Sequence, residues 1–449
     1  MDYQVMIVGG GIAGLTLAVK LASCSIDVLL VEKDAKSGLI YKGELLQPKS
    51  LKILDKLGVY EDIQQNWESL PSIVMTEYDQ DGDELELIGK NEFRYDIIHS
   101  KYNTSVMIPH EKLKEILFQK AKLFPHFHHI RPGKFTGFMN KHNRRIAKVK
   151  TSDEEIAIEA GFYIGAEGRI SPVRNEMNVT LKKYSYNHHF LTVSFPKPPS
   201  LKTSSIITTQ KRFLGLFPLP DDQVRSVLLI KPGEYKIMRK EGLESFYHTY
   251  IELLPELEGF VDQIQSWNQV QLMIPVRHNV SNYIQDNCVL VGDAAHSVHP
   301  MAGEGMNLAI QDSDVLGELL CWMYDTSQTD PIHLKWYEQV RKPRAEFVSK
   351  LSNQAALLYS FPSSAWQKLR MGGIHNTARN SKLHFKQMLN TSGLGIWRFT
   401  LMDRMKQIGL LPHFLGSRSI SPYEQEKHFF TEIENYPWLK LGSDQRRNS

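Results

Sequence analysis

The stretch "VMIVGGGIAGLTLA" (residues 5–18) decides the fold of the N-terminal half of the chain. Its first residues form a continuous apolar run, typical of a buried parallel strand, and residues 12–22 predict the helix that follows. "DVLLVEK" (27–33) predicts a second buried strand that ends in an acid. Together the three segments predict a βαβ unit, and therefore an α/β fold.

The turn of this unit contains Gly9, Gly11 and Gly14 in the pattern GxGxxG. Such glycines make a tight turn, let the backbone approach a pyrophosphate, and allow the helix to pack closely on the strand. Glu32 stands where a carboxylate accepts hydrogen bonds from ribose hydroxyls, and it would repel a 2′-phosphate. We therefore expect a Rossmann-type unit that binds the adenosine half of NAD or FAD. The residues predicted at this end are Gly9, Gly11, Ile12, Ala13, Gly14, Glu32 and Lys33.

A second glycine-rich turn lies in "VGDAAHSVHPMAGEGMNLAIQD" (291–312). Residues 287–293 predict a short apolar strand ending in Gly-Asp, and residues 303–320 predict a helix opened by glycines. Backbone N–H groups at such an opening suit a negative group, whereas Asp293 suits a hydroxyl-bearing linker better than a phosphate. Two such turns predict either two ligands or one ligand long enough to contact both.

This second stretch resembles the class A flavoprotein monooxygenases, the family of para-hydroxybenzoate hydroxylase. Their motif GDAAHxxxPxxGxGMN matches Gly292, Asp293, Ala294, Ala295, His296, Pro300, Gly303, Gly305, Met306 and Asn307. The resemblance implies that one FAD spans both turns. It also implies that Asp293 binds the ribityl side and that the amides around Gly305, Met306 and Asn307 face the flavin pyrimidine.

Two segments depart from the family pattern. The family element GADG occurs as "YIGAEGRISPVR" (163–174), in which Glu167 replaces the family's aspartate. In "VMIPHEKLKEIL" (106–117), His110 stands where relatives carry arginine, and Lys42 is a candidate to supply the missing charge. By resemblance, Glu167, His110 and Lys42 are predicted near the cofactor.

Residues 183–269 contain several alternating apolar and polar segments, which predict an inserted antiparallel sheet with one covered face. In the family such a sheet covers the flavin and holds the substrate. The predicted domains are an FAD-binding domain (1–182 and 270–360), the substrate-domain sheet (183–269), and a helical C-terminal region with a disordered tail (361–449). "GLFPLP" makes Leu216, Phe217 and Pro218 candidates for lining the substrate cavity. His188 and His189 are weak candidates for deprotonating a phenol, with a structural role favoured.

Composition limits the partners and the location. The net charge of +3 over 449 residues is small and excludes a nucleic-acid-binding class of protein. The three cysteines, Cys24, Cys288 and Cys321, lie in apolar runs without metal-ligand spacing, which predicts free buried thiols in a reducing, cytoplasmic setting and no metal site. No apolar run approaches the roughly 18 residues of a membrane-spanning helix.

Residues 361–420 carry nine lysines and arginines against a single acid, Asp403, with aromatic residues interleaved. Basic helices with aromatic faces are typical of proteins that lie on anionic membranes. A helical region packed on the flavin domain has the same composition, and we favour it. Peripheral membrane contact stays open as the alternative.

The resemblance also implies the chemistry. NAD(P)H reduces FAD, O2 adds to the flavin, and the resulting C4a-hydroperoxide delivers one oxygen atom without a side-chain nucleophile. The GDAAH and GMN motifs favour hydroxylation of a lipophilic aromatic or polyketide-like molecule of secondary metabolism. "GELLQP" (43–48) is similar to a segment of squalene epoxidases, so epoxidation of an alkene or isoprenoid is the alternative. FAD-dependent reduction of isoprenoid double bonds and mere storage of FAD are further alternatives.

Overall fold

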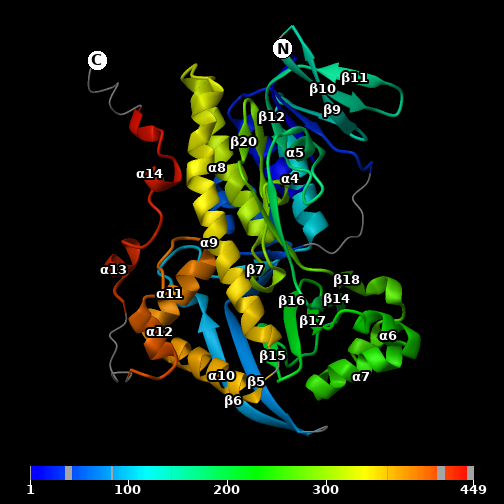
Figure 1. Ribbon diagram of the computed structural model, residues 1–449, viewed down its shortest axis with the longest axis vertical. Coiled ribbons are helices and arrows are strands. Elements are labelled where there is room, and N and C mark those ends of the chain that lie inside the picture. The colour runs from blue at the N-terminus through cyan, green and yellow to red at the C-terminus, as the bar shows by residue number, and fades with distance from the viewer. Residues whose placement is uncertain are drawn as a thin grey trace.

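The computed structural model describes residues 2–35, 43–81, 84–142, 144–361, 363–411 and 420–441. Two large sheets lie at opposite ends of an elongated molecule, and the long helix α9 (Lys335–Ser360) extends between them (Figure 1). Lys42 and the tail "GSDQRRNS" (442–449) lie outside the described residues.

The first sheet has six strands in the order β20-β21-β12-β1-β2-β8, and all neighbouring pairs are parallel except β20 with β21. The predicted elements at its centre are present, since the apolar run forms β1 and the glycine turn opens α1. The strands are β1 (Tyr3–Val8), β2 (Val28–Val31), β8 (Phe127–Ile130), β12 (Ala160–Gly165), β20 (Ile284–Gln285) and β21 (Cys288–Leu290). The helices that cover it include α1 (Ile12–Ser23), α4 (His110–Lys122) and α8 (Gly305–Asp325). This arrangement confirms the Rossmann-type α/β fold.

The second sheet has seven strands in the order β18-β14-β17-β16-β15-β5-β6. They are β5 (Ser72–Asp81), β6 (Glu84–Arg94), β14 (His189–Pro196), β15 (Ser204–Thr208), β16 (Phe213–Leu219), β17 (Gln223–Ile230) and β18 (Gln271–Met273). Its pairs are antiparallel except β15 with β5, which run parallel. The sheet therefore extends beyond the predicted range 183–269, because β5 and β6 join it from a distant part of the chain.

Three smaller sheets complete the β-structure of the described residues. One is a meander of β9 (Lys134–Lys141), β10 (Arg144–Lys150) and β11 (Glu155–Ile158). The second joins β13 (Leu181–Ser185), β19 (Val276–Val280) and β22 (His296–Ser297), and the third joins β3 (Leu45–Leu46), β4 (Glu68–Leu70) and β7 (Ser105–Met107). Helices α6 (Glu234–Glu241) and α7 (Leu243–Leu253) follow β17 in the chain. Apolar residues of α7 and of the seven-stranded sheet form a second hydrophobic core, separate from the core of the first sheet. The remaining helices in this part of the chain are α2 (Pro48–Lys56), α3 (Tyr60–Gln64) and α5 (Pro172–Glu176).

The C-terminal region is helical, as predicted. It contains α10 (Ser364–Arg379), α11 (Ser381–Ser392), α12 (Leu401–Gln407), α13 (Pro422–Glu426) and α14 (Glu432–Asn435). The last helix packs on the first domain, where the Tyr436 hydroxyl donates to Asp314 (2.8 Å) and Trp438 is buried in the main core. Of the helices in the described ranges, none has the length and apolar character that crossing a bilayer requires.

The prediction of three free cysteines is wrong for two of them. Cys24, after the last turn of α1, forms a disulfide with Cys321 on α8, with their Cα atoms 6.0 Å apart. Apolar neighbours in the sequence gave no sign of this pairing, because the two residues meet only once α1 and α8 pack together. Cys288 on β21 is free and buried, as expected.

Candidate active site

The first glycine turn is shaped by contacts of its own backbone. Gly9 has a φ of +108°, and a Cβ atom there would lie 2.6 Å from the Ala166 carbonyl. A Cβ atom at Gly14 would collide with the Gly9 carbonyl oxygen, so this glycine permits α1 to pack against the turn. At Gly11, by contrast, a Cβ atom would meet no described protein atom within 4 Å. Gly11 therefore faces open space, and it lines the large cavity of the molecule.

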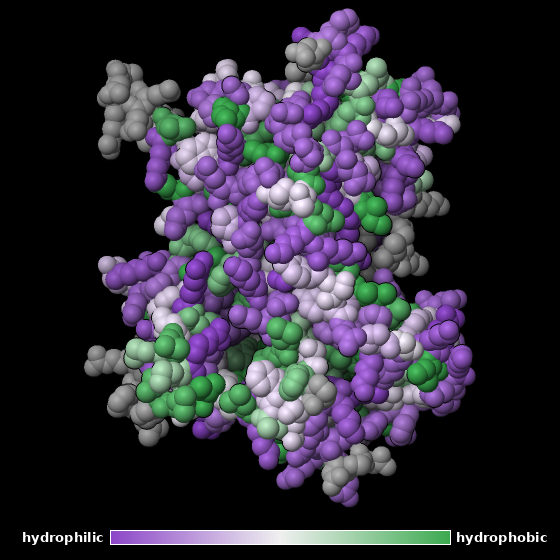
Figure 2. Space-filling model, viewed as in Figure 1, coloured by the Kyte–Doolittle hydropathy of each residue, from purple (hydrophilic) through white to green (hydrophobic). Residues whose placement is uncertain are grey.

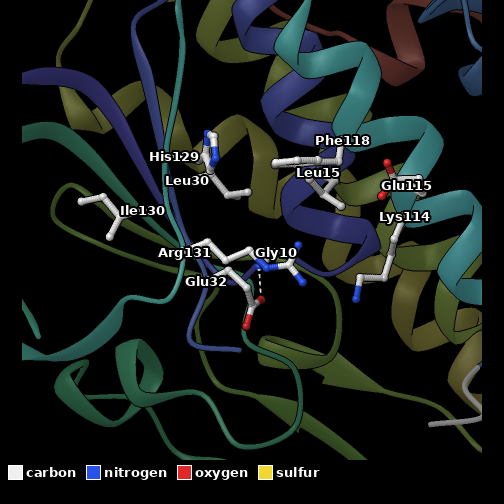
Figure 3. A pocket seen from close by; sticks show the side chains of 10 residues that line it. All are labelled: Gly10, Leu15, Leu30, Glu32, Lys114, Glu115, Phe118, His129, Ile130 and Arg131. Carbon is white, nitrogen blue, oxygen red and sulfur yellow. Dashed lines mark hydrogen bonds between the residues drawn. The ribbon is translucent and has the colours of Figure 1, made fainter. Parts of the chain in front are cut away.

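Glu32 lies beside this turn, as predicted. Its carboxylate accepts hydrogen bonds from the Gly10 N–H (2.7 Å) and the Asp34 N–H (2.9 Å). Figure 3 shows the guanidinium of Arg131 next to Gly10 and Glu32, with the Lys114 ammonium pointing toward the same space. Sequence reasoning missed both cations, which follow β8 and lie on α4 respectively. Ile12, Ala13, Lys33 and His110 also line the large cavity.

The second turn is held by a buried polar network. Asp312 on α8 is fully buried and accepts from the Gly292 N–H (2.9 Å), His296 Nε2 (2.7 Å) and Arg341 Nε (2.7 Å). Burial alone would raise the pKa of Asp312, but His296 and Arg341 hold it below its usual range. The histidine of the GDAAH motif thus faces away from the cavity and fixes the turn. Arg341 was not predicted, because it lies on α9, outside the motif.

The rim of the second turn opens on the same cavity as the first. Asp293, Pro300, Gly303, Gly305 and Met306 line it. Gly292 is not among the lining residues; its φ is +58°, and a Cβ atom there would lie 3.1 Å from Ala309 Cβ and 3.4 Å from Ala13 Cβ. Asn307 is not among them either, since its side chain accepts from the Gln47 N–H (2.8 Å) and the Ser50 hydroxyl (2.7 Å). Asn307 therefore positions the 43–50 segment against α8.

Glu304 lines the cavity between these residues, yet its side chain is buried. Its Oε1 has no hydrogen-bond partner among the described residues. Burial raises the pKa of Glu304 well above its usual range and so favours the protonated carboxyl, which can donate a hydrogen bond. A buried polar atom without a partner calls for a polar group inside the cavity.

Glu167, the departure from the family element, also lines the cavity. Its carboxylate accepts from the Ser171 hydroxyl (2.6 Å) and the Val173 N–H (3.0 Å), and so it caps the short helix α5. Burial raises the pKa of Glu167 to about 7. Nearby, Arg174 donates to the Ala294 carbonyl (2.9 Å), which joins this element to the second turn.

One cavity of about 1980 Å³ connects both turns with the face of the seven-stranded sheet. Phe217 lines it, whereas Leu216 packs in the core on the opposite face of β16 and Pro218 is not among the lining residues. Side chains alternate along a strand, so three consecutive residues cannot share one face. Apolar lining residues from the sheet include Ile73, Met75, Phe93, Ile206, Phe213, Phe217, Val227, Leu272 and Met273.

Neither His188 nor His189 is among the described residues that line the cavity. His188 Nε2 lies 2.9 Å from His299 Nε2, and the Met301 N–H donates to His299 Nδ1 (3.2 Å). Because Nδ1 of the neutral ring accepts, the hydrogen of His299 lies on Nε2, and this N–H donates the hydrogen bond to His188 Nε2. Burial lowers the pKa of both rings, that of His299 to about 3, so the pair is neutral.

Two buried ion pairs at the cavity wall escaped sequence reasoning. Arg225 on β17 makes a bidentate contact with Glu44 (2.7 and 2.9 Å), and both residues are less than one-tenth exposed. Arg370 on α10 pairs with Glu77 on β5. The partners of each pair are far apart in the chain, so no local pattern signals them. Glu44, Leu45 and Gln47 of "GELLQP" all line the cavity.

These residues fit FAD. The N-termini of α1 and α8 open on one cavity, Gly11 leaves room for a phosphate, and the orphaned Glu304 oxygen offers a polar contact between them. Ligand sites usually measure about 300–1000 Å³. A cavity of about 1980 Å³ therefore has room for a dinucleotide and a second ligand.

Comparison with known proteins agrees with this fit. The family described as the FAD binding domain matches residues 2–352. The chain is 26% identical over 323 residues to 6-methylpretetramide 4-monooxygenase from Streptomyces rimosus, across 71% of this chain and 75% of that protein. It is 22% identical over 382 residues to squalene monooxygenase 1,1 from Brassica napus, across 83% and 74% of the two chains.

Among solved structures, p-nitrophenol 4-monooxygenase PnpA from Pseudomonas putida matches with a TM-score of 0.75. Its sequence is 17% identical, and the match covers 88% of this chain and 99% of that one. At this identity the likeness shows the fold alone. The resemblance inferred from the two glycine-rich turns is confirmed by the family match.

Proposed function

Because the chain belongs to the FAD binding domain family and is an FAD-dependent monooxygenase, we propose that it uses NAD(P)H and O2 to hydroxylate a lipophilic aromatic or polyketide-like molecule. The observation that carries the proposal is the single cavity joining both glycine turns to an apolar chamber. Its volume accommodates FAD and a substrate together, and its apolar wall favours a substrate with little charge.

We assign the ADP half of FAD to Gly9, Gly11 and Glu32, and the ribityl side to Asp293. The N–H groups of Gly305 and Met306, at the start of α8, would face the flavin pyrimidine, where the helix dipole stabilises negative charge. Glu304, whose Oε1 has no partner among the described residues, would form a hydrogen bond with the cofactor. When bound and reduced, FAD supplies the activation of O2 and the transfer of one oxygen atom.

The protein's own contribution is orientation and the exclusion of water. Phe213 and Phe217 on β16 and Val227 on β17 present an apolar surface to the chamber. The buried Arg225–Glu44 pair joins the sheet to the segment before β3 and so fixes the distance between the chamber and the FAD end. No side-chain nucleophile enters this mechanism.

Epoxidation of an alkene or isoprenoid is the second candidate reaction. The observation that favours it is that the "GELLQP" segment, similar to one in squalene epoxidases, lies in the cavity wall through Glu44, Leu45 and Gln47. Squalene monooxygenase from Brassica napus is also a relative. Reduction of isoprenoid double bonds would use the same cavity but would consume no O2.

The test is the rate at which NADPH or NADH bleaches the bound flavin without air, with and without phenolic, polyketide and polyene compounds. We expect one class to accelerate reduction, and the same class to support O2 consumption in air with formation of an oxygenated product. Product that is hydroxylated on a ring supports the proposal, whereas an epoxide supports the second candidate. Product formation without O2 consumption would overturn both.

A further inference from the structure

An exposed apolar face occurs where helices α9, α10 and α12 meet. Figure 2 shows apolar side chains gathered there, at the lower left, beside a hollow in the surface. Leu401 is 77% exposed, Leu410 67% and Met402 63%. The other large apolar residues of this face that are exposed are Leu357, Phe361, Leu369 and Ile408. Burying such side chains would stabilise a complex, so this cluster of exposed large apolar side chains indicates a binding surface.

The same face forms the mouth of the large cavity. Four of its exposed residues also line that cavity, which places them at the boundary between the chamber and solvent. They are Leu357, Leu369, Leu401 and Ile408. The chamber lining continues inward through Phe399 and Met405. An apolar path therefore leads from the outer face to the chamber.

The stretch 357–411, which forms this face, is basic, whereas the neighbouring strand β6 carries the exposed Glu84, Glu86 and Glu92. Asp403 is the sole acid between residues 357 and 411, and it is buried and paired with Lys386 (2.6 Å). The exposed charged residues of the same stretch are Lys368, Arg379, Lys382, Arg398 and Arg404. An apolar face whose own helices carry exposed basic residues is complementary to an anionic lipid surface, in which acyl chains lie beneath negative headgroups.

We propose that this face docks on an anionic lipid bilayer and directs the mouth of the cavity into the lipid. Docking is peripheral, with α12 and the end of α9 entering the headgroup region. A lipophilic substrate then passes from the bilayer to the chamber without crossing water. This second step rests on the proposed function, whereas docking itself does not.

The experiment is flotation of the FAD-loaded protein with vesicles. We expect the protein to float with vesicles of phosphatidylglycerol and phosphatidylcholine, to do so less at high salt, and to stay behind with pure phosphatidylcholine. Leu401→Ser leaves the Thr400 cap of α12 intact and should weaken partitioning roughly tenfold, since one leucine no longer enters the lipid. Lys368→Gln should weaken it about fivefold.

Leu123→Ser is the matched control. Leu123 follows α4 and is 74% exposed, close to the exposure of Leu401, but lies outside the proposed face. It should leave partitioning unchanged. Absence of flotation of the folded, FAD-loaded protein would overturn the proposal, and so would equal losses with Leu123→Ser and Leu401→Ser. If the protein did not float but formed a dimer that Leu401→Ser abolished, the face would bind a second copy of the chain. That result would also overturn the proposal.

Flotation needs neither substrate nor reductant, so its result is independent of the proposed reaction. NAD(P)H and O2 consumption with a substrate in solution tests that reaction separately. If docking holds, turnover of a vesicle-borne substrate should fall with Leu410→Ser, at a residue of the face that does not line the cavity, while turnover of a soluble analogue should not change.

Discussion

The two glycine-rich turns precede helices α1 and α8, whose N-termini both face the cavity, but the two turns are stabilised in different ways. The first depends on backbone contacts within about ten residues of sequence and one neighbouring strand, as Gly9 and Gly14 demonstrate. The second depends on Asp312, which gathers His296 from the turn and Arg341 from a separate helix. A local motif can thus specify one end of a ligand site, whereas the other end requires the completed fold.

The largest effect should come from Asp312→Ala, which breaks the second turn alone. Removing this carboxylate leaves the Arg341 guanidinium buried without its partner, at a cost of about 3–5 kcal/mol in free energy of unfolding. Urea denaturation checks the loss. Asp325→Ala, at the exposed end of the same helix, is the control. Equal stability of Asp312→Ala and the parent protein would contradict the role of the network.

The next effect concerns the covalent link between the two helices. Cys24→Ser should lower the free energy of unfolding by about 2–4 kcal/mol, because the disulfide closes a long loop of the unfolded chain. Cys321→Ser should give the same loss, and the double variant should lose no more than either single one. A double variant that loses twice as much would show that the two sulfurs act independently.

Glu167→Gln should change how stability depends on pH. The raised pKa of Glu167, about 7, means that its stabilising contribution is complete below its ordinary pKa of 4.5 and is lost as the pH rises through 7. The shift from 4.5 to about 7 corresponds to about 3 kcal/mol. Urea midpoints at pH 5 and pH 8 should therefore differ less in Glu167→Gln than in the parent. The exposed Glu154→Gln variant should behave as the parent.

Gly11→Ala should have the smallest effect on folding and a clear effect on binding. Its added methyl meets no described protein atom, so the unfolding free energy of the FAD-free protein should stay within about 0.5 kcal/mol. The methyl enters the space assigned to a phosphate and should cost FAD about 1–3 kcal/mol of binding free energy. Gly14→Ala, which collides with Gly9, should instead destabilise the protein itself. Loss of stability in Gly11→Ala would mean that this glycine is structural.

This contrast also explains what the sequence could predict. Gly9, Gly11, Gly14 and Glu32 lie within one βαβ unit, so their spacing sufficed to place them. Asn307 belongs to a recognisable motif, but its side chain holds the 43–50 segment, a role that depends on a partner far away in the chain. The motif predicted the position and not the contact.

Other parts of the site depended on the strand register or on long-range pairing. Phe217 lines the cavity and Leu216 does not. Which of these two neighbouring side chains points into the cavity depends on the register of β16 in its sheet, and this register forms only in the folded chain. The Arg225–Glu44 pair and the Cys24–Cys321 disulfide join residues from distant segments, and neither has a local signature. Lys42 and His188 remain predictions without a tested role in binding or catalysis.

The measurement that tests the central claim most directly is the affinity of Gly11→Ala and Asp293→Ala for FAD, ADP and riboflavin, by calorimetry. If one FAD spans both turns, Gly11→Ala should weaken FAD and ADP but not riboflavin, and Asp293→Ala should weaken FAD and riboflavin but not ADP. One FAD should bind per chain. Full FAD affinity in Asp293→Ala, or two FAD molecules per chain, would contradict the account.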